Sequence, residues 1–95
     1  MLPIEENMLT ILPGFVKGVV YDTTINNPIV GAEIIVLDTS AFFTTGNDGE
    51  YFIKLPIDSY VLHVEADGYQ PKEVEITITQ NDQWLIQDIE LQKIS

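Results

Sequence analysis

The sequence predicts an all-β domain: a two-sheet, Greek-key type β-sandwich of seven short strands in an antiparallel or mixed arrangement. Stretches rich in β-branched and aromatic residues alternate between apolar and polar positions, and this period of two is that of a strand. Clusters of Gly, Pro, Asn and Asp separate these stretches, and no segment sustains a helical period. Short strands spaced in this way are typical of a sandwich.

Length and composition predict one soluble domain with a modest core. The chain has 95 residues, of which 45% are hydrophobic, and no Cys. It therefore has room for one core, and it has no disulfide, thiolate metal site or cysteine nucleophile.

The charge argues against two classes of partner. Four Lys and no Arg oppose 15 acidic residues, for a net charge of −11. Nucleic acids and anionic membranes require clustered cations, so neither is an expected partner. We expect no membrane insertion, because no apolar run reaches the length of a span. No basic region precedes an apolar one at the N-terminus, so no signal peptide is predicted in this chain.

Residues 1–14 are predicted to be an N-terminal linker or edge segment, with residues 9–12 pairing weakly along an edge. A helix is the alternative, but the stretch between Pro3 and Pro13 is too short to hold one alone.

The first strand is expected at 15–22, where Gly18 indicates a bulge or the close approach of a neighbouring element. After a turn at 23–28, a second strand is expected at 30–38 and a third at 42–45. The second strand directs its alternate apolar residues inward: Ala32, Ile34 and Val36.

Asn47-Asp48-Gly49 predicts a tight turn that sets the register of the strands it joins. The next strand, 50–55, ends at Pro56, which cannot donate to a sheet ladder. Its inward residues are Tyr51, Ile53 and Leu55. Another alternation over residues 60–66 follows so closely that we expect it to pair antiparallel with 50–55.

Two strands complete the chain. Residues 67–71 form a turn in which Gly68 takes the unusual backbone conformation. A strand at 73–79 then turns Val74, Ile76 and Ile78 inward and its Glu and Thr residues outward, which is typical of a sheet with one wet face. A last strand at 84–93 turns Leu85, Ile89 and Leu91 inward. Because the polar Gln87 shares that phase, a bulge or break is expected there.

Four motifs occur in order: VKGVVYD at 16–22, NPIVGAEIIV at 27–36, TGNDGEYFIKL at 45–55 and YVLHVEADGYQP at 60–71. Over residues 15–92 the chain resembles the carboxypeptidase regulatory-like domain, a transthyretin-like (prealbumin-like) sandwich of seven strands. The resemblance implies that residues 15–95 form such a domain. It also implies an extracytoplasmic location (secreted, periplasmic or cell surface), because members are non-catalytic modules of metallocarboxypeptidases, outer-membrane receptors and bacterial surface or secreted proteins.

No catalytic group, cofactor or metal is expected. His63 is the only His and points outward with Val61 and Glu65, and no Ser lies in a nucleophile-elbow motif. Oxygen ligands for Ca²⁺ are a minor hypothesis, because their spacing lacks the EF-hand pattern. These residues are Asn47, Asp48, Glu50 and Asp67.

An isopeptide crosslink like that of related adhesin sandwiches is a further minor hypothesis. It would join Lys17 to Asp88, with Glu65 as the assisting acid. The strand alternation argues against it, because Lys17 and Glu65 both alternate away from the core-facing positions.

Exposed aromatic residues are the remaining functional signal. Phe52 and Trp84 are the leading candidates for a contact surface, followed by Tyr69 and His63. The main hypothesis is a non-catalytic accessory module (a spacer, stabilising or protein-interaction domain) of a larger bacterial surface or secreted protein. Its partners would be other domains of that protein or a separate protein. The alternative is a carbohydrate-binding module that stacks a polysaccharide on these aromatics.

Overall fold

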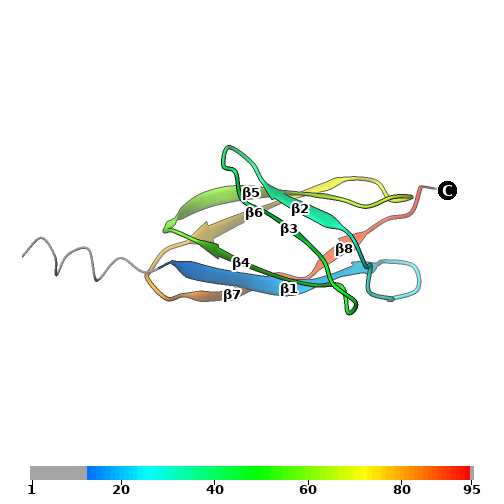
Figure 1. The fold of residues 1–95 in the computed structure, drawn as a ribbon, viewed down its shortest axis with the longest axis horizontal. Helices are drawn as coiled ribbons and strands as arrows, with labels where there is room; N and C mark the ends of the chain where they lie inside the picture. Colours follow the sequence, from blue (N-terminus) through cyan, green and yellow to red (C-terminus); the bar gives the residue numbers. More distant parts are fainter. Residues whose placement is uncertain (1–12, 95) are drawn as a thin grey trace, which may run out of the picture.

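A computed structural model describes residues 13–94, and Figure 1 shows them as two layers of strands. The predicted all-β class is confirmed, and no helix in this part of the chain is long and apolar enough to cross a membrane. The strands are β1 (Gly14–Asp22), β2 (Glu33–Val36), β3 (Phe42–Thr44), β4 (Glu50–Leu55), β5 (Asp58–Glu65), β6 (Lys72–Ile78), β7 (Trp84–Ile86) and β8 (Ile89–Leu91).

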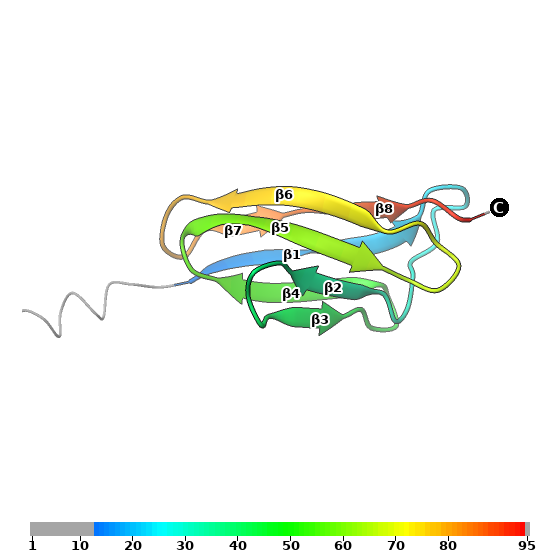
Figure 2. The same cartoon turned by 90° about the horizontal axis from the view of Figure 1, so that it is seen from above.

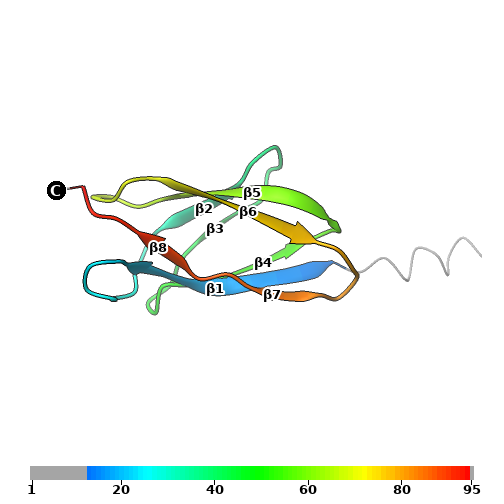
Figure 3. The ribbon, with the colours of Figure 1, turned by 180° about the vertical axis from the view of Figure 1, so that it is seen from behind.

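The strands form two sheets. The first sheet has the order β4-β1-β7 (Figure 3). β7 pairs with the first half of β1, and β8 pairs with its second half. The second sheet has the order β3-β2-β5-β6 (Figure 2). β1 is antiparallel to β4 but parallel to β7 and β8, which confirms a mixed sandwich. The predicted seventh strand is thus present as two short segments.

The core lies between the sheets and contains the residues that the alternation predicted. Ala32, directly before β2, and Ile34 and Val36 of β2 are fully buried, and the inward residues of β4 and β8 are nearly so. Val74 and Leu85 pack against this cluster while remaining half-buried. The phase of these strands was therefore predicted correctly.

Two predicted pairings were wrong. β4 pairs with β1, whereas β5 pairs with β2 and β6, so Pro56-Ile57 carries the chain from the first sheet to the second. β3 pairs with β2, so Asn47-Asp48-Gly49 also joins different sheets and sets no hairpin register. A strand with one apolar face can join either sheet, and alternation alone therefore does not distinguish a hairpin from a crossing.

Gly49 is required for a different reason. Its φ is 71°, a conformation that residues with a Cβ rarely adopt. A Cβ at this position would also lie 2.7 Å from the carbonyl oxygen of Val20, at the end of β1. The turn is therefore packed tightly against the first sheet.

The start of β1 differs from the prediction by one residue. Gly14 belongs to β1, whereas the sequence assigned it to the N-terminal segment. The predicted edge pairing of residues 9–12 lies outside the described residues.

Gly18 lies where the last strand breaks. A Cβ on Gly18 would lie 2.1 Å from the carbonyl oxygen of Gln87, so the bare backbone makes room for that carbonyl. The Tyr51 hydroxyl donates a 2.5 Å hydrogen bond to the same oxygen. Burial raises the pKa of Tyr51, which keeps its hydroxyl protonated as a donor. Both expectations, a close approach at Gly18 and a break at Gln87, are confirmed.

Gly18→Ala should therefore destabilise the domain by about 1–3 kcal/mol, because the methyl group collides with backbone in a packed core. Gly46→Ala is the matched control, since a Cβ there meets nothing within 4 Å. Urea unfolding of both variants checks this. An effect of Gly18→Ala as small as that of Gly46→Ala would show that the last strand does not need this close approach.

Candidate functional site

The outer face of the first sheet carries the candidate contact surface. Phe15 of β1 lies between Lys54 of β4 and Trp84 of β7. In the next outward row, Lys17 lies between Phe52 and Ile86. The strand pairing thus brings together outward side chains from three separate parts of the chain.

Phe15, Phe52 and Trp84 form one aromatic cluster on this face. The ring centroids of Phe15 and Trp84 are 4.8 Å apart, and those of Phe15 and Phe52 are 5.7 Å apart. Phe52 and Trp84 complete the triangle at 5.9 Å. The Lys17 ammonium lies 5.4 Å from the centre of the Trp84 ring, within the range of a cation–π interaction.

The cluster is apolar and accessible. Trp84 is 56% exposed, Ile86 66% and Phe52 37%, whereas Phe15 is half-buried between Phe52 and Trp84. A hollow of about 560 Å³ continues the surface beyond Phe52 toward Asn47 and Asp48. A contiguous exposed apolar patch rimmed by polar groups is typical of a binding surface.

Phe15 is the central ring of the cluster. It stacks on both Phe52 and Trp84, with interplanar angles of 15° and 26°. Trp84 lies on β7, at the end of the strand order of the first sheet, and remains 56% exposed. The cluster therefore presents aromatic surface that a partner can cover.

Phe15, Lys17 and Ile86 were not among the residues predicted for a contact surface. The alternation already placed Phe15, Lys17 and Ile86 outward, so the signal was present. The parallel pairing of β1 with β7 joins residues almost 70 positions apart, and nothing in the local sequence indicates that pairing.

Tyr69 lies elsewhere, where the loop after β5 meets the end of β1. Its hydroxyl donates a 2.6 Å hydrogen bond to Asp22 Oδ2, and Asp22 Oδ1 accepts one from the Thr24 amide at 2.7 Å. The hydrogen bond from Tyr69 is the largest effect on the pKa of Asp22 and lowers it; burial opposes this, and the amides of Thr24 and Ile25 lower the pKa further. Tyr69 thus joins the two sheets at this end of the sandwich.

His63 lies on the outer face of the second sheet, where it contacts two carboxylates. Its Nε2 is 2.7 Å from Glu65 and its Nδ1 is 3.0 Å from Glu73. These two contacts, that with Glu65 first, raise the pKa of His63. Both ring nitrogens are engaged, so the geometry describes an ion-pair bridge between β5 and β6.

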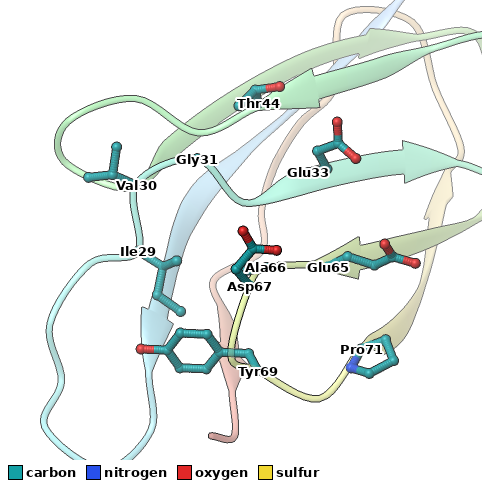
Figure 4. A pocket seen from close by; sticks show the side chains of 10 residues that line it. All are labelled: Ile29, Val30, Gly31, Glu33, Thr44, Glu65, Ala66, Asp67, Tyr69 and Pro71. Atoms are coloured by element: carbon teal, nitrogen blue, oxygen red, sulfur yellow. The ribbon is translucent and has the colours of Figure 1, made fainter. Parts of the chain in front are cut away.

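The predicted calcium ligands are distributed over two sites. Asp67 lines an open groove of about 860 Å³ with Glu33 and Glu65, near the ring of Tyr69 (Figure 4). Asn47, Asp48 and Glu50 instead line the hollow beside Phe52. Within residues 13–94, no three acidic or His side chains are arranged to hold a metal ion.

The candidate isopeptide residues are not brought together either. Lys17 lies over Trp84 on the outer face of the first sheet. Asp88 accepts a hydrogen bond from the Val19 amide at 3.0 Å, and Glu65 contacts His63 on the second sheet. This arrangement does not support a crosslink.

Comparison with known proteins identifies sequence relatives. The family model of the carboxypeptidase regulatory-like domain matches residues 16–92. The catalytic chain of carboxypeptidase N from Rattus norvegicus is 38% identical over 63 residues. That match covers 66% of this chain but 14% of the relative, so the chain spans a small part of the curated relative's length.

Similar folds occur in proteins of different kinds. BcpA, the major pilin subunit of Bacillus cereus, matches with a TM-score of 0.72 and 18% identity, over 87% of this chain and 31% of that chain. Chlorocatechol 1,2-dioxygenase from Pseudomonas putida matches with a TM-score of 0.70 and 12% identity, over 88% of this chain and 61% of that chain. At these identities the similarity shows the fold alone.

The His63 bridge predicts a pH dependence. His63 should titrate above its usual pKa of 6.5, because the two carboxylates favour the imidazolium. A raised folded-state pKa means that its contribution to stability is complete below the unfolded pKa and is lost as pH rises through the folded value. NMR titration of the ring protons checks this. Glu65→Gln should lower the pKa, whereas Glu75→Gln, the control, should not; equal values in all three proteins would contradict the bridge.

Proposed function

Because this chain belongs to the carboxypeptidase regulatory-like domain family, we propose that it is a non-catalytic accessory module of a longer protein. In this proposal it acts by packing the outer face of its first sheet against another domain or a partner protein. The observation that carries the proposal is the cluster of Phe15, Phe52 and Trp84 on the outer face of the first sheet, with Lys17 beside it.

The shape of the domain supports a place in series with other domains. The start of β1 and the C-terminal end lie at opposite ends of the sandwich (Figure 1). Its relative from Rattus norvegicus is much longer than the region it shares with this chain. A module joined at both ends can separate its neighbours while packing sideways against one of them.

The contact surface has the composition of an interaction hot spot. Aromatic side chains dominate binding energy where a partner buries them fully, and surrounding polar groups exclude water. In this proposal Lys17 and Lys54 provide polar contacts, and they are two of the four lysines of the chain. The hollow beside Phe52 can receive a side chain of the partner.

The remaining polar clusters support a non-catalytic role. Both nitrogens of His63 contact carboxylates, and the Ser59 hydroxyl bonds with that of Thr77. In a nucleophile activated by a base, the hydroxyl would contact the imidazole. Here the Ser59 hydroxyl contacts Thr77 and the His63 imidazole contacts carboxylates, so the two are not paired in that way. A secreted, periplasmic or cell-surface location in a bacterium remains a prediction from the family resemblance.

Site-specific photo-crosslinking in the longer protein tests the proposal. Benzoylphenylalanine in place of Ile86 should crosslink to a neighbouring domain or a partner protein, because Ile86 lies within the contact surface and is largely exposed. The same residue in place of Glu75, on the outer face of the second sheet, is the matched control. Crosslinks from both positions alike, or from neither, would contradict a role for the first sheet's outer face.

A further inference from the structure

The first and last strands of residues 13–94 are neighbours in one sheet. β1 pairs with β7 and then with β8, from Phe15 opposite Trp84 to Asp22 opposite Leu91. Both pairings are parallel, so the start of β1 and the end of β8 lie at opposite ends of this junction, which we call the seam. Figure 1 shows the seam running lengthwise through the domain.

Hydrogen bonds cross the seam from one end to the other. Besides the bonds of the paired strands, these are bonds of 2.7–3.0 Å that join Phe15 to Gln83, Lys17 to Gln87, Val19 to Asp88 and Thr23 to Leu91. Hydrogen bonds between paired strands run across the strand direction. A pull along the seam therefore strains all of these bonds together, whereas a pull across it breaks them one after another.

β1 is also held on its other side and from within. It pairs with β4 from Gly14 to Val19, so it has a neighbouring strand on each side. Its inward side chains, Val16 and Val20, are fully buried in the core. Sliding β1 along its own axis would break both pairings and draw apolar side chains out of the core, which costs free energy.

The chain after β8 is fastened near the same end of β1. Residues 68–70 hold it by backbone hydrogen bonds of 2.8 and 3.0 Å, and Tyr69 forms a β-bridge with Lys93. The Tyr69 hydroxyl donates in turn to Asp22, the last residue of β1. A pull on Ile94 is thus shared between β8 and this loop, so it does not peel β8 away from its end.

We propose that the domain bears tension along the chain, with the seam as the element that resists extension. This function goes beyond lateral contact, and its use rests on the proposed place in series with other domains. Force that enters at residue 13 and leaves at residue 94 acts along the seam, so the domain stays folded and keeps the spacing of its neighbours. The resistance lies in the rate of unfolding, because forced unfolding is governed by that rate.

Single-molecule pulling of the full chain in two directions tests the proposal. Because the chain has no Cys, handles can be attached at one engineered Cys pair in each variant. In Pro13→Cys, Ile94→Cys the force acts along the seam. In Thr24→Cys, Ile94→Cys it separates the neighbouring ends of β1 and β8, and both Thr24 and Ile94 are exposed.

At one loading rate, the rupture force should be at least about twofold higher along the seam than across its end, because bonds strained together resist more than bonds broken in turn. Both variants contain the same fold, so the comparison does not depend on a difference in their unfolding free energies. Equal forces, or a lower force along the seam, would overturn the proposal.

A matched pair of substitutions tests whether the seam is the resisting element. The exposed Asp88 accepts a hydrogen bond from the Val19 amide across the seam, whereas the exposed Asp58 accepts one from the adjacent Ser59 amide. Asp88→Ala should lower the rupture force along the seam, and Asp58→Ala should leave it unchanged. The same change in both, or none in either, would overturn this assignment. Since pulling uses the chain alone and crosslinking uses the longer protein, either proposal can fail while the other stands.

Discussion

The close approach of the Gln87 carbonyl to Gly18 is the constraint on which the first sheet depends. Gly18 leaves space for that carbonyl, and the Tyr51 hydroxyl donates a hydrogen bond to its oxygen. Beside it, the Val19 amide donates to the Asp88 carboxylate instead of to a backbone carbonyl of a neighbouring strand. The last strand can therefore follow β1 along its length although a polar residue falls at an inward position. The same placement sets Trp84 opposite Phe15, so the contact surface depends on it as well.

Much of the inward and outward pattern could be predicted from the sequence, because burial on one face imposes a period of two. The pairing of the strands could not. Asn47-Asp48-Gly49 and Pro56-Ile57 have the residues of tight turns, yet both connections pass between sheets. The aromatic cluster was predicted only in part for the same reason. Phe52 was singled out from its phase and Trp84 as an aromatic near a strand end, but Phe15 joins them through a long-range parallel pairing.

The two outer faces of the sandwich differ in chemistry. The second sheet exposes carboxylates bridged by His63, and at its β3 edge Phe42, which is 67% exposed beside Ile35. The first sheet exposes stacked aromatics beside two lysines, in a chain whose net charge is −11. Because similar sandwiches occur in a pilin subunit and in a dioxygenase, the fold alone assigns no function. The proposed function therefore rests on the outer face of the first sheet, where three aromatic rings are brought together.

The central claim is that the aromatic cluster serves contact and not folding, and the unfolding free energy of Trp84→Ala tests it most directly. Trp84 is 56% exposed, so we predict a loss of only about 1 kcal/mol, the worth of its aromatic contacts. Ile34→Ala, at a fully buried core position, provides the scale and should cost about 2–5 kcal/mol. A loss for Trp84→Ala as large as that for Ile34→Ala would contradict the claim, because the cluster would then be part of what holds the sandwich together.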